Sequence, residues 1–241
     1  MAIVVSAGIE IGPGITMGGG FAPSVTLVYD LDAANYAAVP TNGSVTDGAG
    51  TTGQRTLTVA NAGASISWQS ANGGLFRKST NSGTDVIYGG PNWVTGQSYS
   101  VFMAYRRIAT SDGRLLNTQS EASKDWLMGL YNGHPNTFYP NFAVNLPSSG
   151  ADLVWRFGWA TWNTATSLGQ LYTATSAQPT GTSFAVTNGG GGGFNQLRMF
   201  SRSAGTEVQT ADIGFVKAYS GVFTLADVQG LYNQYKTRFG Y

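Results

Sequence analysis

The sequence predicts an all-β fold, a sandwich of two antiparallel sheets with one short helix at its C-terminal end. Charged residues make up only 10% of the 241 residues, while glycine contributes 34. This composition indicates short strands joined by tight turns rather than a helical bundle. Apolar and polar residues alternate through most of the chain, and the last segment alone has the apolar spacing of a helix. A sandwich of this length commonly forms one domain.

The predicted strands follow from this alternation. The first covers residues 25–31, whose apolar positions are Val25, Leu27, Tyr29 and Leu31. Two short strands are expected within residues 57–68, around a turn at 61–63. Residues 99–106 are apolar on both faces, which indicates a central strand. Further strands are expected over residues 114–117, 126–131, 137–144, 153–162, 168–175 and 194–202.

Three connections are expected to be long polar loops, over residues 71–96, 132–150 and 187–193. They are rich in glycine, proline and asparagine, and the last one ends in consecutive glycines. Long loops on a rigid sandwich are the usual place for binding.

The last strand is expected over residues 211–219. Its alternation puts Ile213, Phe215 and Tyr219 on one face and Asp212, Gly214, Val216 and Ala218 on the other. After a short turn, Thr224 and Asp227 have the spacing of a capping box that starts a helix. Phe223 is placed for a hydrophobic staple with Val228. The apolar stripe of the helix consists of Leu225, Val228, Leu231, Tyr232 and Tyr235, and Gly240 can end it.

The two ends of this domain resemble a known family. Residues 213–240, with their aromatic strand end, Thr-capped helix and Arg-Phe-Gly ending, are similar to the last elements of LamG-like jelly-roll domains. Residues 25–35 (VTLVYDLDAAN) are similar to the first strand of the same domains, which belong to the concanavalin A-like lectin-glucanase superfamily. The likeness is strongest to versions found in virion structural proteins of tailed bacteriophages. It implies a concanavalin A-like β-sandwich (jelly roll) over residues 24–241.

Residues 1–23 differ from the rest and are expected to form an extended, glycine-rich N-terminal arm. A G-I-x-[IM]-G unit occurs twice at a spacing of six, with the apolar positions Ile9, Ile11, Ile15 and Met17. Each unit can extend as a short strand, and the glycines interrupt it. Such a segment cannot bury its apolar face alone, so we expect it to dock on another subunit or on a particle. The alternative is an unattached leader.

Charge and cysteine content argue against several function classes. The formal net charge is +1 and the only adjacent basic pair is Arg106-Arg107, so nucleic-acid binding is not expected. The absence of cysteine removes disulfides and thiol chemistry. The sequence contains neither a membrane-spanning apolar segment nor the pattern of a secretory signal peptide. We therefore expect synthesis in a host cytoplasm and no membrane insertion.

The residues give little support to catalysis. Glucanases of this fold carry their catalytic carboxylates in a Glu-x-Asp-x-Glu run on one strand. This chain has no such run, and its glutamates, Glu10, Glu121 and Glu207, are far apart in the sequence. None of them has a carboxylate two residues away. Asp30 and Asp32 share a strand face, but they lie in the opening strand. His134, the only histidine, lies in a predicted turn without a Gly-x-Ser-x-Gly motif. We expect no catalytic residues and no enzymatic activity.

Calcium is the cofactor that the resemblance brings into question. Concanavalin A-like domains often hold Ca²⁺ through Asp, Asn and carbonyl oxygens in loops. The aspartates near predicted loops are Asp85, Asp112, Asp125 and Asp152. They form no Asp-x-Asp cluster, so polar turns explain them better. The sequence therefore predicts no metal ligands and no cofactor.

Carbohydrate binding is the function with most support from the residues. Sugars stack their apolar faces on Trp and Tyr while polar side chains bond the hydroxyls. Aromatic residues in or beside the predicted loops are Trp93, Trp126, Tyr131, His134, Tyr139 and Trp162. The alternative is that these aromatics pack the core or a subunit interface.

We therefore expect a non-enzymatic phage virion structural protein that decorates a capsid or attaches a tail or fibre, and that binds host-surface glycans. Its partners would be other virion proteins, contacted through the arm, and further copies of itself in a homo-oligomer. The alternatives are a purely architectural virion protein without glycan binding and, with least support, a glycan hydrolase.

Overall fold

The computed structural model covers the chain unevenly. It describes residues 21–39, 43–45, 55–60, 65–81, 86–88, 98–108, 113–118, 126–131, 134–140, 144–145, 153–163, 165–166, 168–174, 180–185, 197–201 and 207–241. The apolar arm positions Ile9, Ile11, Ile15 and Met17 lie outside these residues, as does Trp93. Within them the chain is a β-sandwich of two antiparallel sheets with one short C-terminal α-helix, which confirms the predicted fold class.

The first sheet has the strand order β14-β13-β12-β7-β16-β5-β4. These strands are β14 (Thr180–Ala185), β13 (Leu168–Ala174), β12 (Arg156–Asn163), β7 (Tyr99–Arg107), β16 (Ala211–Ser220), β5 (Leu75–Lys78) and β4 (Ile66–Gln69). An eighth strand, β1 (Thr26–Asp32), also pairs with β16. Because β7 pairs along the whole of one edge of β16, β1 and β5 share the other edge.

The second sheet has the order β11-β10-β9-β8-β15-β6-β3-β2. Its strands are β11 (Val144–Asn145), β10 (His134–Pro140), β9 (Trp126–Tyr131), β8 (Gly113–Thr118), β15 (Leu197–Met199), β6 (Val86–Tyr88), β3 (Arg55–Ala60) and β2 (Gly43–Val45). The two strands expected within residues 57–68 exist, but they enter different sheets, since β3 joins the second sheet and β4 the first.

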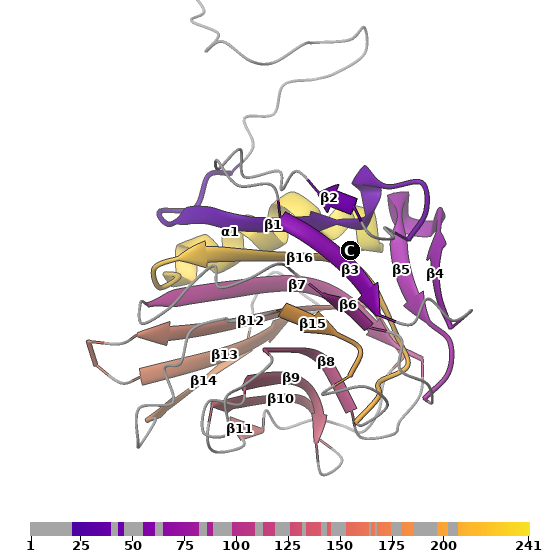
Figure 1. Cartoon of the computed structure of the whole chain (residues 1–241). Helices are drawn as coiled ribbons and strands as arrows, with labels where there is room; N and C mark the ends of the chain where they lie inside the picture. The colour runs from indigo at the N-terminus through magenta and orange to yellow at the C-terminus, as the bar shows by residue number, and fades with distance from the viewer. Residues whose placement is uncertain are drawn as a thin grey trace, which may run out of the picture.

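Two apolar cores divide the molecule into three layers. An inter-sheet core combines side chains of both sheets, among them Tyr29, Met103, Leu116 and Met199. An outer core lies between the first sheet and α1 (Leu225–Tyr235), and it contains Phe102, Trp159, Phe215, Leu231 and Tyr232. The first sheet is therefore buried on both faces, with α1 behind it and the second sheet in front (Figure 1).

The central strand of the first sheet confirms the prediction from its two apolar faces. Tyr99, Val101 and Met103 of β7 belong to the inter-sheet core. Phe102 and Ala104 belong to the outer core. β7 lies between β12 and β16, so both of its edges are paired as well.

A β-bulge divides the alternation expected for the first strand. The β1–β16 register shifts between Leu27 and Tyr29. Leu27 consequently packs against the outer core, whereas Tyr29 and Leu31 enter the inter-sheet core. The strand expected over residues 25–31 is present as β1, but its alternating apolar positions divide between the two cores, because the extra residue of a bulge reverses the faces beyond it.

A second bulge corrects the predicted faces of β16. The register against β7 shifts between Ile213 and Phe215, so Ile213 lies in the inter-sheet core and Phe215 and Tyr219 lie in the outer core. The prediction that these three share a face is wrong. Gly214 is needed at the bulge, because an added Cβ would lie 2.5 Å from the Phe239 ring.

Two of the predicted long loops contain strands. β5 and β6 lie within residues 71–96, and β10 and β11 lie within residues 132–150. β10 overlaps the strand expected over residues 137–144, whereas turn-forming residues hide the alternation of the short strands β5, β6 and β11. β14 lies in a further segment for which no strand was expected.

The C-terminal helix begins as predicted. The Thr224 hydroxyl accepts from the Asp227 N–H (3.1 Å), and Asp227 accepts from the Thr224 N–H (2.8 Å), which completes a capping box. Val228, Leu231 and Tyr232 are buried, but Leu225 is 54% exposed and does not belong to the apolar stripe. Capping contacts rather than burial of Leu225 hold this first turn.

After α1 the chain continues as the 3-10 helix η3 (Lys236–Phe239), which Gly240 ends in the left-handed conformation, as predicted. Shorter 3-10 turns are η1 (Ala33–Asn35) and η2 (Ala71–Gly73). No helix in the described part of the chain has the length and apolar character needed to cross a membrane.

The start of the described chain is attached to α1. Ser24 donates from its N–H and its hydroxyl to the two carboxylate oxygens of Asp227, at 2.7 and 2.8 Å. Gly230 leaves room for the Phe21 ring, because an added Cβ would lie 2.4 Å from that ring. Residues 21–23, which the prediction assigns to the arm, thus lead directly onto the helix.

Candidate functional site

The second sheet carries a group of polar side chains on its outer face, away from the first sheet. Arg198 of β15 pairs with Asn117 of β8, and Asn117 pairs with Leu127 of β9. Arg114 pairs with Gly129, two positions from Leu127 on the same strand. Paired residues share a face of a sheet, so Arg114, Asn117 and Arg198 lie on one face. We call these residues, with Ser201 and Glu207, the second-sheet site.

A bulge in β8 explains how Arg114 and Asn117 share a face although they are three residues apart. The register shifts between Arg114 and Leu116, which adds one residue. Leu115 and Leu116 are both buried in the inter-sheet core. The two leucines thus pack β8 against the first sheet, while Arg114 and Asn117 on either side of them lie on the outer face.

The excursion is the chain between Phe200 and Gln209, and its two described ends, Phe200 and Glu207, contact β8. It starts and ends at one place, because the Gln209 N–H donates to the Phe200 carbonyl (2.8 Å). The Arg114 N–H donates to the Glu207 carbonyl (2.9 Å), which fixes the returning chain on β8. Gly113 permits this approach, since an added Cβ would lie 2.6 Å from the Val208 carbonyl oxygen.

Left-handed backbone occurs at both ends of the excursion. Phe200 has φ 73° and Glu207 has φ 46°, which non-glycine residues adopt at an energetic cost. Such residues persist where surrounding contacts hold them, and they gather at binding sites. The Phe200 side chain is fully buried and the Glu207 backbone is bonded to β8, so both conformations are held in place.

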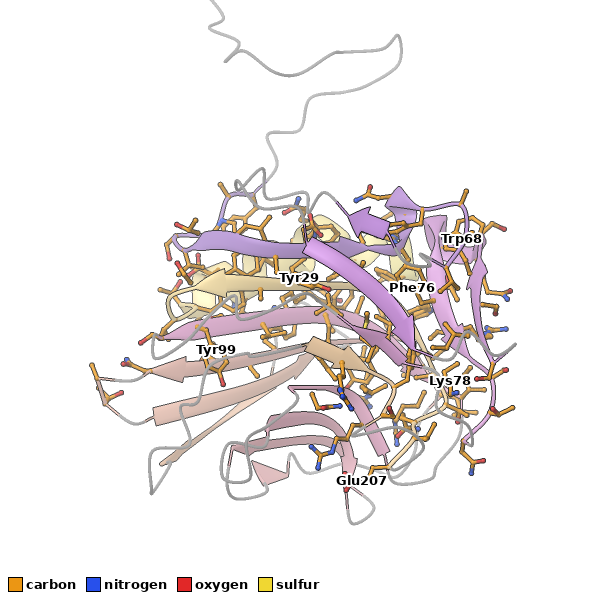
Figure 2. The ribbon with its side chains drawn as sticks, in the orientation of Figure 1. Tyr29, Trp68, Phe76, Lys78, Tyr99 and Glu207 are labelled. Carbon is orange, nitrogen blue, oxygen red and sulfur yellow. The ribbon has the colours of Figure 1, made fainter. Side chains whose placement is uncertain are left out.

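One ion pair reaches the surface from this site. Arg114 Nε lies 2.5 Å from Glu207 Oε2, and the Arg114 side chain is 5% exposed while that of Glu207 is 40% exposed. Figure 2 shows Glu207 at the lower side of the view, well away from Tyr29 and Trp68. Glu207 is therefore the exposed partner of this ion pair, and a buried guanidinium holds its carboxylate in position.

Two buried oxygen atoms of the site have no hydrogen-bond partner among the described residues. Asn117 donates from its side-chain amide to the Ser201 carbonyl, but its Oδ1 accepts nothing. The Ser201 hydroxyl is likewise unpaired, and both side chains are 0% exposed. Buried polar atoms normally find partners, so a pair of unpaired ones beside a strained segment marks a candidate binding site.

The chemistry of this group suits hydrogen bonding rather than bond cleavage. Amide, hydroxyl and carboxylate oxygens accept, and guanidinium groups donate. A ligand with several hydroxyl groups can satisfy both kinds, because each hydroxyl donates and accepts. Glu207, the carboxylate of the group, forms an ion pair with Arg114.

The two aspartates of the opening strand are engaged elsewhere. Asp30 lies 2.5 Å from Lys217 Nζ, and Asp32 lies 2.8 Å from Arg238 Nη1. Each carboxylate thus serves a contact between β1 and the C-terminal region. Within the described part of the chain, His, Asp and Glu residues form no group of three that could hold a metal ion.

The predicted aromatic residues are distributed over both sheets. Tyr139 of β10 pairs with Leu127, so it continues the row of Asn117 and Arg198. Tyr131 and His134 pair with each other at the other end of the same hairpin. Trp126 pairs with Pro140, one position along the strand from the Tyr139 row.

Trp162 lies apart from the others. It belongs to β12 of the first sheet, where it pairs with Tyr99 and Gly169. The backbone therefore brings Trp126, Tyr131, His134 and Tyr139 together on β9 and β10, and Trp162 is not part of that hairpin. A joint role of the set in sugar binding stays a prediction.

The polar members of the second-sheet site were not predicted. Isolated polar residues such as Arg114 and Asn117 in a strand usually indicate a solvated face. Both residues contact chain segments that are distant in the sequence, since Arg114 pairs with Glu207 and Asn117 donates to the Ser201 carbonyl. The one available signal is the Gly113-Arg114 start of β8, because glycine in a strand marks close approach of another backbone.

Several solved structures share this fold. Domain 4 of AbnA, an extracellular GH43 arabinanase from Geobacillus stearothermophilus, in complex with arabinotriose, matches with a TM-score of 0.62 at 12% identity. The match covers 89% of this chain and 98% of that domain. At such identity the likeness shows the fold alone. No family model matches the sequence, and no curated protein matches it.

Bacterial toxin domains match as well. The botulinum neurotoxin serotype D ligand-binding domain in complex with N-acetylneuraminic acid has a TM-score of 0.60 at 13% identity over 86% of this chain. The binding domain of Paraclostridial Mosquitocidal Protein 1 has a TM-score of 0.59 at 14% identity over 87% of this chain. The chain spans about half the length of these toxin domains, 50% and 52%.

Proposed function

We propose that this chain is a non-enzymatic glycan-binding module that serves as a virion structural protein. The observation that carries glycan binding is the second-sheet site, where Asn117 Oδ1 and Ser201 Oγ have no partner among the described residues and Arg114, on the same strand as Asn117, holds the exposed carboxylate of Glu207. Support also comes from the fold, because domain 4 of the arabinanase, which matches almost over its full length, is complexed with arabinotriose.

In this proposal the polar residues bond sugar hydroxyls and an aromatic residue supplies a stacking surface. Glu207 reaches the ligand first, because it is the exposed member of the site. Tyr139 lies in the same register row as Asn117 and Arg198, so it is the predicted aromatic residue best placed to join them. Stacking on an aromatic ring combined with a few fixed hydrogen bonds is a common way to bind small polar ligands.

A screen of immobilised glycans against the full chain, followed by calorimetry on the glycans that bind, tests this proposal. We expect Glu207→Gln and Tyr139→Ala each to weaken binding about tenfold, equivalent to about 1.4 kcal/mol. Leu225→Ala, an exposed change on α1, is the control and should bind as the native chain does. Binding that neither Glu207→Gln nor Tyr139→Ala affects would contradict the site, and absence of any glycan binding would contradict the function.

The non-enzymatic part of the proposal is supported by the state of the carboxylates. Asp30, Asp32 and Glu207 each form an ion pair with a basic side chain. Glycosidases need a second carboxylate within about 5–10 Å that is free to transfer a proton or attack. A reducing-end assay with bacterial surface polysaccharides should therefore give no signal, and clear release of reducing ends would refute it.

The virion role is carried by the resemblance of residues 25–35 and 213–240 to domains of tailed-phage proteins. Deleting residues 1–20 should abolish incorporation into particles while the remaining domain still folds, because Phe21 and Ser24 keep their contacts with α1. Unchanged incorporation would refute docking by the arm. Trp126→Ala particles that assemble and still bind cells normally would favour a purely architectural role for the aromatic residues.

A further inference from the structure

A second group of charged residues lies on the opposite side of the sandwich, on the outer face of the first sheet. Asp212 of β16 pairs in register with Arg77 of β5 and with Arg106 of β7. Arg77 donates to Asp212 Oδ1 from Nε (2.7 Å) and to Oδ2 from Nη2 (2.9 Å). Arg106 donates to Oδ2 from Nε (3.1 Å) and from Nη2 (2.6 Å). We call Arg77 and Arg106, joined in this way, the arginine pair.

The arginine pair has unused charge and unused donors. The Asp212 side chain is 0% exposed, whereas each guanidinium belongs to a side chain that is 34% exposed. One carboxylate balances only one of the two positive charges. A guanidinium has five N–H donors, and the bonds to Asp212 occupy Nε and one terminal nitrogen of each arginine. The remaining terminal nitrogen of each arginine has no hydrogen-bond partner among the described residues.

Packing holds the pair in place before any ligand arrives. The hydrogen bonds to Asp212 raise the pKa of Arg77, so its charge is secure. The Arg106 guanidinium lies 5.3 Å from the centre of the Trp155 ring, and Trp155 packs in turn against Phe239 in a tilted arrangement, at 4.5 Å between ring centres. A guanidinium fork that is already oriented loses less entropy when it binds an oxyanion.

Exposed apolar side chains border the pair. Leu153 precedes Trp155 by two residues, just before β12, and Ile108 follows Arg106 by two residues, just after β7; β12 and β7 are adjacent antiparallel strands. Leu153 is 53% exposed and Ile108 is 38% exposed. Tyr241, 37% exposed, donates from its hydroxyl to the Trp155 carbonyl at the same edge. The exposed parts of the two guanidinium groups thus lie on the same side of the first sheet as these apolar groups.

We propose that the arginine pair is a second binding site, specific for a sugar that carries a carboxylate, such as a uronic or sialic acid. The carboxylate would bridge the outward nitrogens of Arg77 and Arg106, which match its geometry. The C–H face of the sugar ring would lie on Leu153 and Ile108. A free inorganic anion would use the guanidinium groups but gain nothing from the apolar border. The choice of a sugar rests on the proposed glycan-binding function; the anion specificity rests on the pair itself.

Titration of the full chain with glucuronic acid and N-acetylneuraminic acid tests the proposal, with glucose, acetate and inorganic phosphate as comparison ligands. We expect the acidic sugars to bind about tenfold or more tightly than glucose and than acetate. The methyl groups of Leu153 and Ile108 should change their NMR shifts with the acidic sugars. Equal binding of phosphate or acetate would overturn the assignment to a sugar, and unchanged methyl signals would overturn the location.

Variants separate this site from the second-sheet site. Arg77→Gln should weaken acidic sugars about tenfold, and Arg77→Lys, which keeps the charge but loses the planar fork, should weaken them as well. Lys236→Gln removes one positive charge elsewhere on this side of the molecule and is the matched control. Thermal unfolding of each variant identifies any loss of fold. The NMR shifts of the Leu153 and Ile108 methyl groups locate the site in the native chain, so this result does not depend on variants.

The two proposals fail in different ways. If neutral glycans bind and only the Glu207 and Tyr139 variants lose them, while acidic sugars show no preference, the second site is refuted and the proposed function stands. If acidic monosaccharides bind at the arginine pair but no glycan depends on Glu207 or Tyr139, the second site stands and the second-sheet site is refuted. If no sugar binds at all, both are refuted.

Discussion

Arg238 holds Asp32 with two hydrogen bonds from one nitrogen, Nη1, at 2.8 and 2.9 Å from the carboxylate oxygens. The same guanidinium donates from Nε to the Asn72 carbonyl (2.7 Å) and from Nη2 to the Gly74 carbonyl (2.8 Å). One side chain thus joins the end of β1, the η2 turn and the end of the chain. Asp32 and Arg238 thus connect residues near the two ends of the domain.

Replacing Arg238 by methionine should lower the free energy of unfolding by about 3 kcal/mol, because Asp32 and two carbonyls lose a largely buried partner. Urea unfolding followed by tryptophan fluorescence measures the change. Lys236→Met, which removes a neighbouring cation that lies over the Tyr232 ring, is the control and should cost less than about 1 kcal/mol. Equal effects of the two changes would show that the Asp32 contact contributes little.

The effect of Gly230→Ala on stability should change sign when Phe21 is also replaced by alanine. Gly230→Ala should destabilise the native chain by about 1–2 kcal/mol, because the new methyl group displaces the Phe21 ring from α1. In a Phe21→Ala background the same change should stabilise by up to about 1 kcal/mol, since alanine favours a helix interior. Thermal or urea unfolding of the four proteins measures both effects. Destabilisation of equal size in both backgrounds would refute the contact.

Asp227 should make the junction between Ser24 and α1 depend on pH. Burial alone would raise the pKa of Asp227, but hydrogen bonds from Ser24 and Thr224 outweigh it and lower the pKa. A lowered pKa in the folded state means that the stabilisation is complete above the unfolded value of about 3.9 and is lost as the pH falls through the folded value. The stability difference between the native chain and Asp227→Asn, about 1–2 kcal/mol, should stay constant from pH 7 to about 4 and then shrink. A difference that grows in acid would contradict this assignment.

Buried tyrosines should make the fold sensitive to alkali. Burial, with the nearby charges of Asp30 and Asp32, raises the pKa of Tyr36 to about 12, and burial raises the pKa of Tyr99 and Tyr219. Raised values in the folded state mean that stability is complete below the unfolded value near 10 and falls as the pH rises above it. Absorbance titration at 295 nm should therefore show these tyrosines ionising only above pH 10, together with unfolding. Tyr36→Phe should reduce the loss of stability between pH 10 and 12, and an identical profile would contradict the assignment.

The sequence predicted those parts of the fold in which local pattern and tertiary packing agree. Apolar residues on both faces of 99–106 correctly indicated a central strand, because β7 is buried on both sides. The capping box at Thr224 and Asp227 was visible because both partners lie within one helical turn. The two bulges, at Leu27–Tyr29 and Ile213–Phe215, were not visible, since one added residue leaves composition and average alternation unchanged.

The candidate site was predicted less well, for a physical reason. Sequence reasoning selected aromatic residues near loops, and Trp155 and Trp159 show that such residues also build the outer core of this fold. Arg114 becomes part of a site only because Glu207, far along the chain, folds back onto β8. The same holds for the arginine pair, whose members lie on β5 and β7 and meet through β16. Contacts of this kind have no local pattern.

The position of β16 has a consequence for how the domain is made. Within the domain this strand leaves the ribosome after every other strand, yet it is paired with β7, β5 and β1 in the middle of the first sheet. Leu27 meets its partner Tyr219 only after nearly the whole domain has been translated. Until then the nascent chain exposes two incomplete halves of a sheet, and a transcript truncated before residue 211 yields an aggregation-prone product rather than a smaller folded one.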